Sequence, residues 1–276
     1  MAIPNNGHTT ASLSTGGGDA DNNRGSVAND QADMSSLTSG NAVENKTNIK
    51  ALVRANYDII AARYLIWAIS FPSPRLEFLQ KVMERLQTRA LATNFTKPKP
   101  RVLELGCGAG VPATQLMVRS GYAVIANDIS AAQMQLAREH VVVSPTSDES
   151  EQNECGSVEF VHADMMNLDY PSDSFDAVVG LYSIFHLPRD EQEVLIGRIY
   201  RWLKQGGYLL MNVGAMDESG SIQEDFLGED MYWSWFPEKV YREIVTREGF
   251  VVVETEVRVE VEDGREVHFM WILGRK

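Results

Sequence analysis

Three glycines alternate with small residues in Glu104-Leu-Gly-Cys-Gly-Ala-Gly110, directly after a short apolar run that starts at Val102. A buried strand followed by glycines and Pro112 is typical of a turn into a helix at a nucleotide site. In a dinucleotide site the glycines run G-x-G-x-x-G, and the pyrophosphate lies on free backbone N–H groups of the helix. Here the spacing is G-x-G-x-G, Glu104 adds a carboxylate, and Pro112 has no N–H to donate. The pattern favours a ligand with a nucleoside, a positive charge and no phosphate.

The next expected strand, 122–127, leads into Asp128, whose two carboxylate oxygens can accept hydrogen bonds from both hydroxyls of a ribose. The glycine motif, with Asp128 at the end of the following strand, resembles the class I S-adenosylmethionine-dependent methyltransferases. The resemblance extends from about residue 50 to residue 276. It implies an α/β fold with a Rossmann-like, seven-stranded methyltransferase sheet, and S-adenosyl-L-methionine as the cofactor. The motif is specific for the cofactor, but it gives little information about the methyl acceptor.

The resemblance also implies a set of cofactor contacts. Asp164 would accept the adenine amine and Met165 would offer a backbone N–H to the ring, although Asp164 also suits the cap of a turn or helix. Tyr57 and Tyr64 precede the first strand, where a ring face can hold a cation, although either ring also suits the core. The expected cofactor-binding residues are Tyr57, Tyr64, Glu104, Gly106, Cys107, Gly108, Gly110, Asp128, Ile129, Asp164, Met165 and Leu181.

His186 follows the fourth expected strand, 175–181, in the run Tyr-Ser-Ile-Phe-His-Leu-Pro. Residues at the carboxyl end of a strand in a parallel sheet face the ligand crevice. Because imidazole titrates near neutral pH, His186 is the predicted general base for a phenol or an amine. The other histidines do not have the spacing of a metal site, so we expect no metal.

Aromatic residues are frequent between the fifth expected strand, 208–213, and an expected helix over 238–248. Loops at this edge of a sheet contact substrates more often than cofactors, so 214–237 is predicted to be an apolar substrate lid. Rings of this kind favour an aromatic or terpenoid-like acceptor. The alternative is that they close the helix onto the sheet. The expected acceptor contacts are Trp67, Tyr182, Phe185, Tyr232, Trp233 and Trp235.

Apolar periodicity predicts the elements that position these residues. Helices over 44–70 and 74–90 precede the first strand and form an N-terminal helical cap. Alternating apolar residues over 250–261, the turn Asp263-Gly264 and the run 267–273 predict a C-terminal antiparallel hairpin. A dehydrogenase sheet ends with parallel strands, whereas the sheet of the resembled family ends with an antiparallel one. The hairpin therefore supports the same fold by an independent route.

Composition limits the partners and the compartment. The chain has 276 residues and a formal net charge of −13, which disfavours nucleic acid because affinity for phosphates comes from Lys and Arg. Its two cysteines, Cys107 and Cys155, form neither a disulfide framework nor a zinc spacing. Without a leader or a membrane-spanning run, the expected location is cytoplasmic. Residues 1–43 are expected to be a disordered tail, and 44–276 a single methyltransferase domain.

These features predict methyl transfer to a small, largely apolar molecule through oxygen or nitrogen, in the setting of a biosynthetic pathway. A sulfonium has a good leaving group, so the protein mainly aligns the reactants, excludes water and removes a proton from the nucleophile. A dedicated base is therefore optional. Two alternatives stay open. One is a protein methyltransferase, for which the acidic surface suits a basic peptide. The other is a protein that binds the cofactor without transferring methyl groups.

Overall fold

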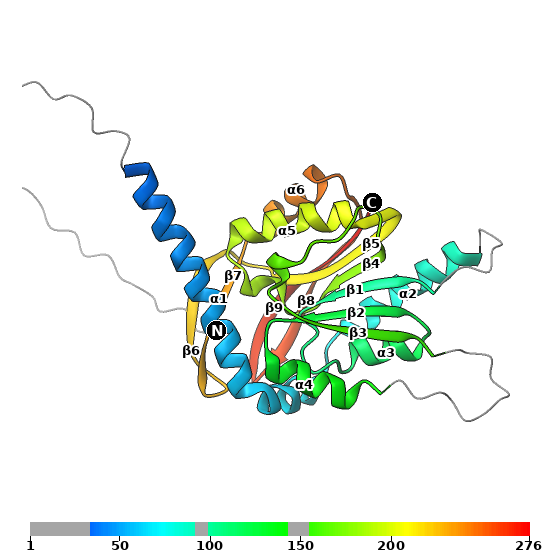
Figure 1. The fold of residues 1–276 in the computed structure, drawn as a ribbon, viewed down its shortest axis with the longest axis horizontal. Helices are drawn as coiled ribbons and strands as arrows, with labels where there is room; N and C mark the ends of the chain where they lie inside the picture. The colour runs from blue at the N-terminus through cyan, green and yellow to red at the C-terminus, as the bar shows by residue number, and fades with distance from the viewer. Residues whose placement is uncertain (1–33, 92–98, 143–154) are drawn as a thin grey trace, which may run out of the picture. The chain divides into compact units, whose positions relative to one another are not determined.

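A seven-stranded sheet with the strand order β3-β2-β1-β4-β5-β9-β8 forms the centre of the fold (Figure 1). The computed structural model describes residues 34–91, 99–142 and 155–276, and the sheet belongs to the unit formed by 48–276. The strands of this sheet are β1 (Arg101–Leu105), β2 (Ala123–Asp128), β3 (Ser157–His162), β4 (Phe175–Gly180), β5 (Leu203–Gly214), β8 (Val251–Glu262) and β9 (Arg265–Arg275). Strands β1 to β5 pair in parallel, whereas β9 runs antiparallel to both β5 and β8. The expected antiparallel hairpin and its place in the sheet are confirmed.

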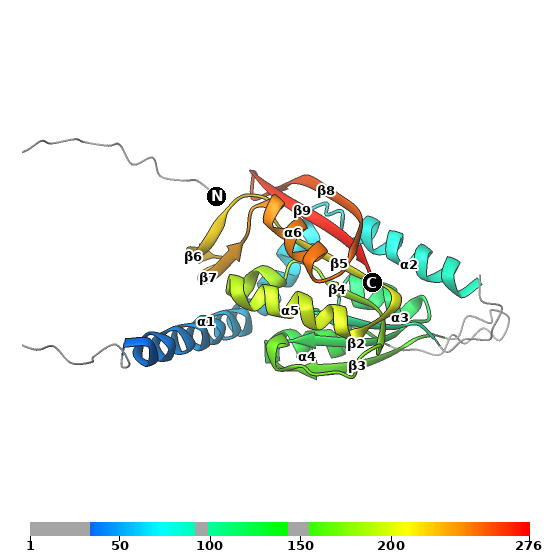
Figure 2. The same ribbon diagram turned by 90° about the horizontal axis from the view of Figure 1, so that it is seen from above.

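Helices cover both faces of the sheet because its inner strands bury side chains on both sides. In β1, Val102 packs in one core cluster and its neighbour Leu103 in the other, as the twofold alternation of a strand requires. The first cluster includes α2 and α3, and the second includes α5 and α6 (Figure 2). The helices are α1 (Met34–Ser70), α2 (Arg75–Leu91), α3 (Ala113–Arg119), α4 (Ala131–His140), α5 (Arg189–Trp202) and α6 (Glu238–Arg247). None of them, within the described ranges, is long and apolar enough to cross a membrane.

The two N-terminal helices meet at the proline-rich link 71–74. Helix α1 begins at Met34, ahead of the expected start at residue 44, in a segment without proline. The rest of the predicted tail, residues 1–33, lies outside the described residues. Helix α2 begins as expected after Pro74, and the backbone N–H of Arg75 donates to the Ser73 hydroxyl at 3.3 Å.

The segment 214–237, expected as a loop, contains two antiparallel strands, β6 (Glu218–Phe226) and β7 (Glu229–Trp235). The loop expectation is wrong because Leu227-Gly228 makes a two-residue hairpin turn. Both residues have positive φ angles, 55° and 92°. A leucine is an unusual residue in such a turn, so the hairpin signal is weak. The hairpin packs against α1 through a cluster of Val53, Tyr57, Ile60, Phe226, Met231 and Tyr232.

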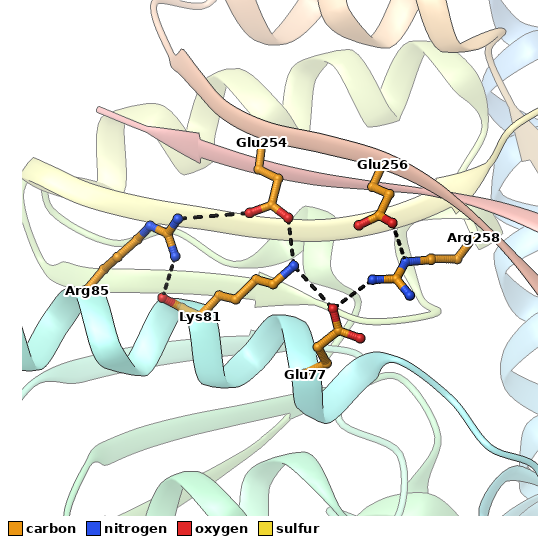
Figure 3. Close-up of polar contacts among 6 residues, drawn as sticks. All are labelled: Glu77, Lys81, Arg85, Glu254, Glu256 and Arg258. Atoms are coloured by element: carbon orange, nitrogen blue, oxygen red, sulfur yellow. Dashed lines mark hydrogen bonds and ion pairs between the residues drawn. The ribbon is translucent and has the colours of Figure 1, made fainter.

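Charged side chains link α2 to β8 on the surface (Figure 3). Lys81 Nζ lies 2.7 Å from Glu254 Oε1 and 3.2 Å from Glu77 Oε1. Arg258 Nη2 lies 2.7 Å from the same Glu77 oxygen, and Arg85 Nη2 lies 3.9 Å from Glu254. These partly exposed pairs connect α2 to β8 at the edge of the sheet, and each contributes little to stability.

Candidate active site

A pocket with an empty volume of about 850 Å³, part of it open to solvent, lies at the carboxyl ends of β1, β2 and β4. The strand order reverses between β1 and β4, which is where ligands bind in open α/β sheets. Sequence reasoning identified much of its lining. The expected residues found there are Tyr57, Tyr64, Glu104, Gly106, Cys107, Gly108, Asp128, Ile129, Met165, Leu181, Tyr182 and His186.

The glycines of the loop have separate roles. Gly106 has a φ of +71°, and a Cβ there would lie 2.3 Å from Ser183 Cβ, so this position requires glycine. Gly110 is absent from the described lining of the pocket, and its expected cofactor contact stays a prediction. A Cβ on Gly110 would lie 2.5 Å from Val141 Cγ2, so this glycine allows the loop to pack beside the end of α4.

Asp128 joins the glycine loop to the start of α4. Its Oδ2 accepts the N–H of Gly108 and its Oδ1 accepts the N–H of Ser130, each at 2.8 Å. Burial raises the pKa of Asp128, and the backbone N–H groups of Ser130, Gly108 and Ile129 partly oppose that rise. A carboxylate has about four acceptor positions, and these backbone N–H groups occupy at most three, so a position remains for a ribose hydroxyl.

Gln133 is a pocket residue that sequence reasoning missed. Its side chain is 1% exposed, and neither atom of its amide has a hydrogen-bond partner among the described residues. A buried amide without partners costs ~1–3 kcal/mol, so the site fits a ligand that both donates and accepts hydrogen bonds, as ribose hydroxyls do. The sequence feature that could have identified Gln133 is its position in the first turn of the helix capped by Ser130. The Ser130 Oγ accepts a hydrogen bond from the Gln133 N–H.

Glu104 supplies the second buried carboxyl group. It is 3% exposed, and its Oε2 accepts a hydrogen bond from the Thr114 hydroxyl at 2.5 Å. Burial raises the pKa of Glu104 to about 7. A cation bound in the pocket would favour the ionised carboxylate, so Glu104 is suited to a positively charged ligand.

His186 is held between a carbonyl group and a hydroxyl group. Its Nδ1 lies 2.9 Å from the backbone oxygen of Tyr232, which can only accept, so Nδ1 carries the hydrogen. Its Nε2 therefore has the free lone pair and accepts a hydrogen bond from Tyr57 Oη at 2.9 Å. Burial lowers the pKa of His186 to about 4, so the ring is neutral at neutral pH. The Tyr57–His186 pair can move a proton from the pocket to the imidazole.

Asp164 and Met165, the expected adenine contacts, differ in position. Met165 lines the pocket, whereas Asp164 is absent from its described lining. The Asp164 Oδ1 accepts the Met166 N–H at 2.8 Å and caps the short helix η1 (Met165–Asn167). Its Oδ2 lies 2.8 Å from Lys50 Nζ. This arrangement matches the alternative interpretation of Asp164 as a turn cap.

The expected acceptor residues, apart from Tyr182, are absent from the described lining of this pocket. The Trp233 ring lies 4.7 Å from the His186 ring and 5.4 Å from the Phe185 ring. Trp235 packs against Gly214, where a Cβ would approach its ring to 2.3 Å. Trp67 lines a smaller neighbouring pocket. Of the hairpin rings, Trp233 lies against His186, and the role of the hairpin in acceptor binding stays a prediction.

Known proteins match the central part of the chain. Residues 103–211 match the family described as "Methyltransferase domain". The methyltransferase GfsG of Streptomyces halstedii is 34% identical over 109 residues, which are 40% of this chain and 36% of that protein. The 27-O-demethylrifamycin SV methyltransferase of Amycolatopsis mediterranei is 30% identical over 133 residues, 48% of this chain and 45% of that protein. The chain therefore spans less than half the length of these relatives.

The fold also matches a solved structure over most of the described chain. The 1,6-didemethyltoxoflavin-N1-methyltransferase of Burkholderia thailandensis, solved with 1,6-didemethyltoxoflavin and S-adenosylhomocysteine, aligns with a TM-score of 0.59 at 17% identity. The alignment covers 84% of this chain and 90% of that one, and it bears on the fold alone. The sheet order, the glycine loop with Asp128 and the family match over residues 103–211 support a class I S-adenosylmethionine-dependent methyltransferase domain in this chain.

Proposed function

We propose that this chain transfers the methyl group of S-adenosyl-L-methionine to an oxygen or nitrogen of a small molecule. The observation that carries the proposal is the meeting, in one pocket, of groups suited to a ribose, Asp128 and Gln133, with the Tyr57–His186 pair. The names of the rifamycin and toxoflavin relatives indicate small acceptors, which supports the same class here. The aromatic residues of the β6–β7 hairpin favour a flat, largely apolar acceptor.

The pocket residues divide between the parts of the cofactor. Asp128 and Gln133 would hold the ribose hydroxyls, and the backbone of Met165 would face the adenine. Glu104 and the ring of Tyr64 would favour the sulfonium cation. A dinucleotide is disfavoured, since Glu104 would repel its phosphates and Pro112 offers no N–H.

The bound cofactor supplies an electrophilic methyl group, and the chain's residues supply alignment and removal of a proton. Tyr57 Oη donates its hydrogen to His186, so its oxygen lone pairs can face an acceptor O–H or N–H. As that proton passes to Tyr57, the hydroxyl proton of Tyr57 passes to His186 Nε2. The low pKa of His186 opposes this step in the free protein. Once the cofactor has supplied its methyl group, His186 would accept the proton without a neighbouring sulfonium charge to oppose it.

The proposal is tested by incubating the purified chain with S-adenosylmethionine and a panel of phenols, amines, carboxylic acids and basic peptides. We expect S-adenosylhomocysteine to form with a small phenol or amine. Turnover with peptides alone would indicate a protein methyltransferase, and cofactor binding without turnover on any panel member would indicate a non-methylating protein. In calorimetry, S-adenosylmethionine and S-adenosylhomocysteine should bind and NAD should not. Binding of NAD in their place would overturn the cofactor assignment.

A further inference from the structure

Strand β8 forms one edge of the seven-stranded sheet, and among the described residues it pairs only with β9. It is 12 residues long, so its outer side presents a row of backbone N–H and C=O groups without strand partners. A bulge between Val252 and Glu254 interrupts the pairing with β9, which is continuous from Glu254 to Glu262. Proteins usually protect such an edge with a proline, a short strand or charges. Strand β8 has no proline, and its charges alternate with valines, so one of its faces carries none.

The uncharged face of β8 is a row of exposed valines. Val257, Val259 and Val261 are 39%, 52% and 54% exposed. Val257 pairs with Met270, which belongs to the core cluster that includes α5 and α6, so the valines continue that side of the sheet to its edge. Apolar side chains gathered along an open edge strand are typical of a surface that another chain covers.

The opposite face of β8 carries charges that complement themselves about a twofold axis. Glu256 Oε1 lies 2.7 Å from Arg258 Nε in the same strand, on the side of α2 (Figure 3). When a second β8 runs antiparallel with Val257 opposite Val257, Arg258 of each strand faces Glu256 of the other, and the four charges alternate in sign. This register also places Val259 opposite Thr255. An axis moved by one residue would place Glu256 opposite Glu256 or Arg258 opposite Arg258, which is unfavourable.

One pair of like charges remains in this register, because Glu254 of each strand faces Glu260 of the other. Both carboxylates already have partners within their own chain. Lys81 Nζ lies 2.7 Å from Glu254 Oε1, and the Tyr182 hydroxyl donates to Glu260 at 2.7 Å. Since Lys81 compensates the charge of Glu254, this pair adds little repulsion.

We propose that β8 pairs with β8 of a second copy of this chain, antiparallel about a twofold axis at Val257, so that the two sheets become one. The contact consists of residues 254–260 of each strand, their valines and the four alternating charges. Two short strands bury less surface than the roughly 1,200–2,000 Å² of a typical stable interface, so the dimer should dissociate on dilution with a dissociation constant of ~1–100 μM.

The oligomeric state of the full chain is measured by sedimentation velocity over a dilution series that spans the micromolar range. We expect the wild type to pass from dimer to monomer. Val257→Lys places two like charges face to face on the axis, so this variant should be monomeric throughout the series. Val251→Lys is the matched control, because Val251 lies on the same strand beyond the bulge and is 66% exposed. It should dimerise as the wild type does.

A cysteine on the axis tests the register. Directly opposite Cα atoms in an antiparallel pair are about 4.5–5.5 Å apart, which a disulfide can span. In a Cys155→Ser background, Val257→Cys should form a covalent dimer under mild oxidation, whereas Val251→Cys should not. Random collision of exposed thiols would link both variants to the same extent.

A wild type that stays monomeric throughout the series would overturn the proposal. A dimer that Val257→Lys does not weaken would also overturn it, because the contact would then lie on another surface. Equal crosslinking of Val257→Cys and Val251→Cys would overturn the register. Melting temperatures check that each variant is folded. None of these measurements involves the cofactor, so their outcome is independent of the proposed function.

Discussion

The hydroxyl of Tyr57 donates a 2.9 Å hydrogen bond to Nε2 of His186, a residue 129 positions away in the chain. Tyr57 comes from α1, and His186 ends the short helix η2 (Ile184–His186) after β4. The carbonyl of Tyr232 fixes the tautomer that leaves Nε2 free to accept. The proposed proton path therefore needs three segments to be in place together.

Replacement of His186 tests whether this path matters for turnover. His186→Ala should lower turnover by ~10²–10⁴, because it removes the final proton acceptor. Tyr57→Phe should lower it in the same direction, and the double variant should be little worse than His186→Ala, since both residues act in one path. Calorimetry with S-adenosylhomocysteine checks that the cofactor still binds. If His186→Ala lowers turnover by less than about tenfold, catalysis depends on positioning of the cofactor and the acceptor and not on His186 as a base.

The same histidine predicts how stability depends on pH. The pKa of His186 is about 4 in the folded chain, whereas an unfolded histidine titrates near 6.5. Between these values the unfolded chain binds more protons, so this group lowers the free energy of unfolding as pH falls from about 6.5 to about 4. Urea titrations at pH 7 and pH 5 measure the loss. His186→Gln should lose less between the two pH values, and an equal loss would show that other groups cause it.

Two buried glutamines should respond in opposite ways to replacement by leucine. The amide of Gln133 has no partner among the described residues, so Gln133→Leu should weaken S-adenosylhomocysteine binding ~5-fold or more without lowering the melting temperature. The amide of Gln192 is satisfied by Tyr241, the Leu187 carbonyl at 2.8 Å and the Ser234 carbonyl at 2.9 Å. Gln192→Leu should therefore lower the melting temperature and leave cofactor binding intact. The reverse result for Gln133 would mean that its amide is part of the core.

Cofactor binding should release protons through Glu104. The pKa of Glu104 is about 7 in the free pocket, and a bound cation lowers it. Binding of S-adenosylmethionine near pH 6.5 should thus release a fraction of a proton, and affinity should increase as pH rises through 7. Calorimetry in buffers with different ionisation heats measures the release. Glu104→Gln should abolish the dependence, and a wild type whose affinity does not change with pH would remove Glu104 from the cation site.

The aromatic hairpin is tested with Trp233→Ala and Trp235→Ala. If these rings form the acceptor pocket, both variants should raise the acceptor's Michaelis constant or change acceptor preference while S-adenosylmethionine affinity changes little. Trp233 lies against the His186 ring, so its variant should also lower turnover. Loss of thermal stability with unchanged preference would show that the rings only pack. The acceptor would then be recognised by α1 around Tyr57 and Trp67.

Local sequence patterns were enough to predict the sheet and the glycine loop. The alternation over β8, the turn Asp263-Gly264 and the spacing of Gly106 to Gly110 are properties of short segments. Asp128 could be placed because parallel strands bring their carboxyl ends to one edge. These features depend on strand period and turn chemistry, which the chain encodes within a few residues.

The parts of the site that were not predicted from the sequence depend on packing between distant segments of the chain. Arg75 was not expected in the pocket, because its place depends on Tyr182, which follows a strand far along the chain. The role of Gln133 depends on a lack of partners among the described residues, which is a property of the folded structure. The β6–β7 hairpin was missed because its turn, Leu227-Gly228, has a glycine in only one of two left-handed positions.

Strand β9 lies inside the sheet, between β5 and β8, yet it is the last of the described elements to leave the ribosome. Until residues 265–275 are made, β5 has an unpaired edge, and the Tyr182 ring lacks its contacts with Phe269 and Trp271. Open edges of this kind pair readily with other chains. The nascent chain therefore reaches a cofactor-competent state only after residues 265–275 have been made, and a chaperone that shields the β5 edge until then would increase the yield of folded protein.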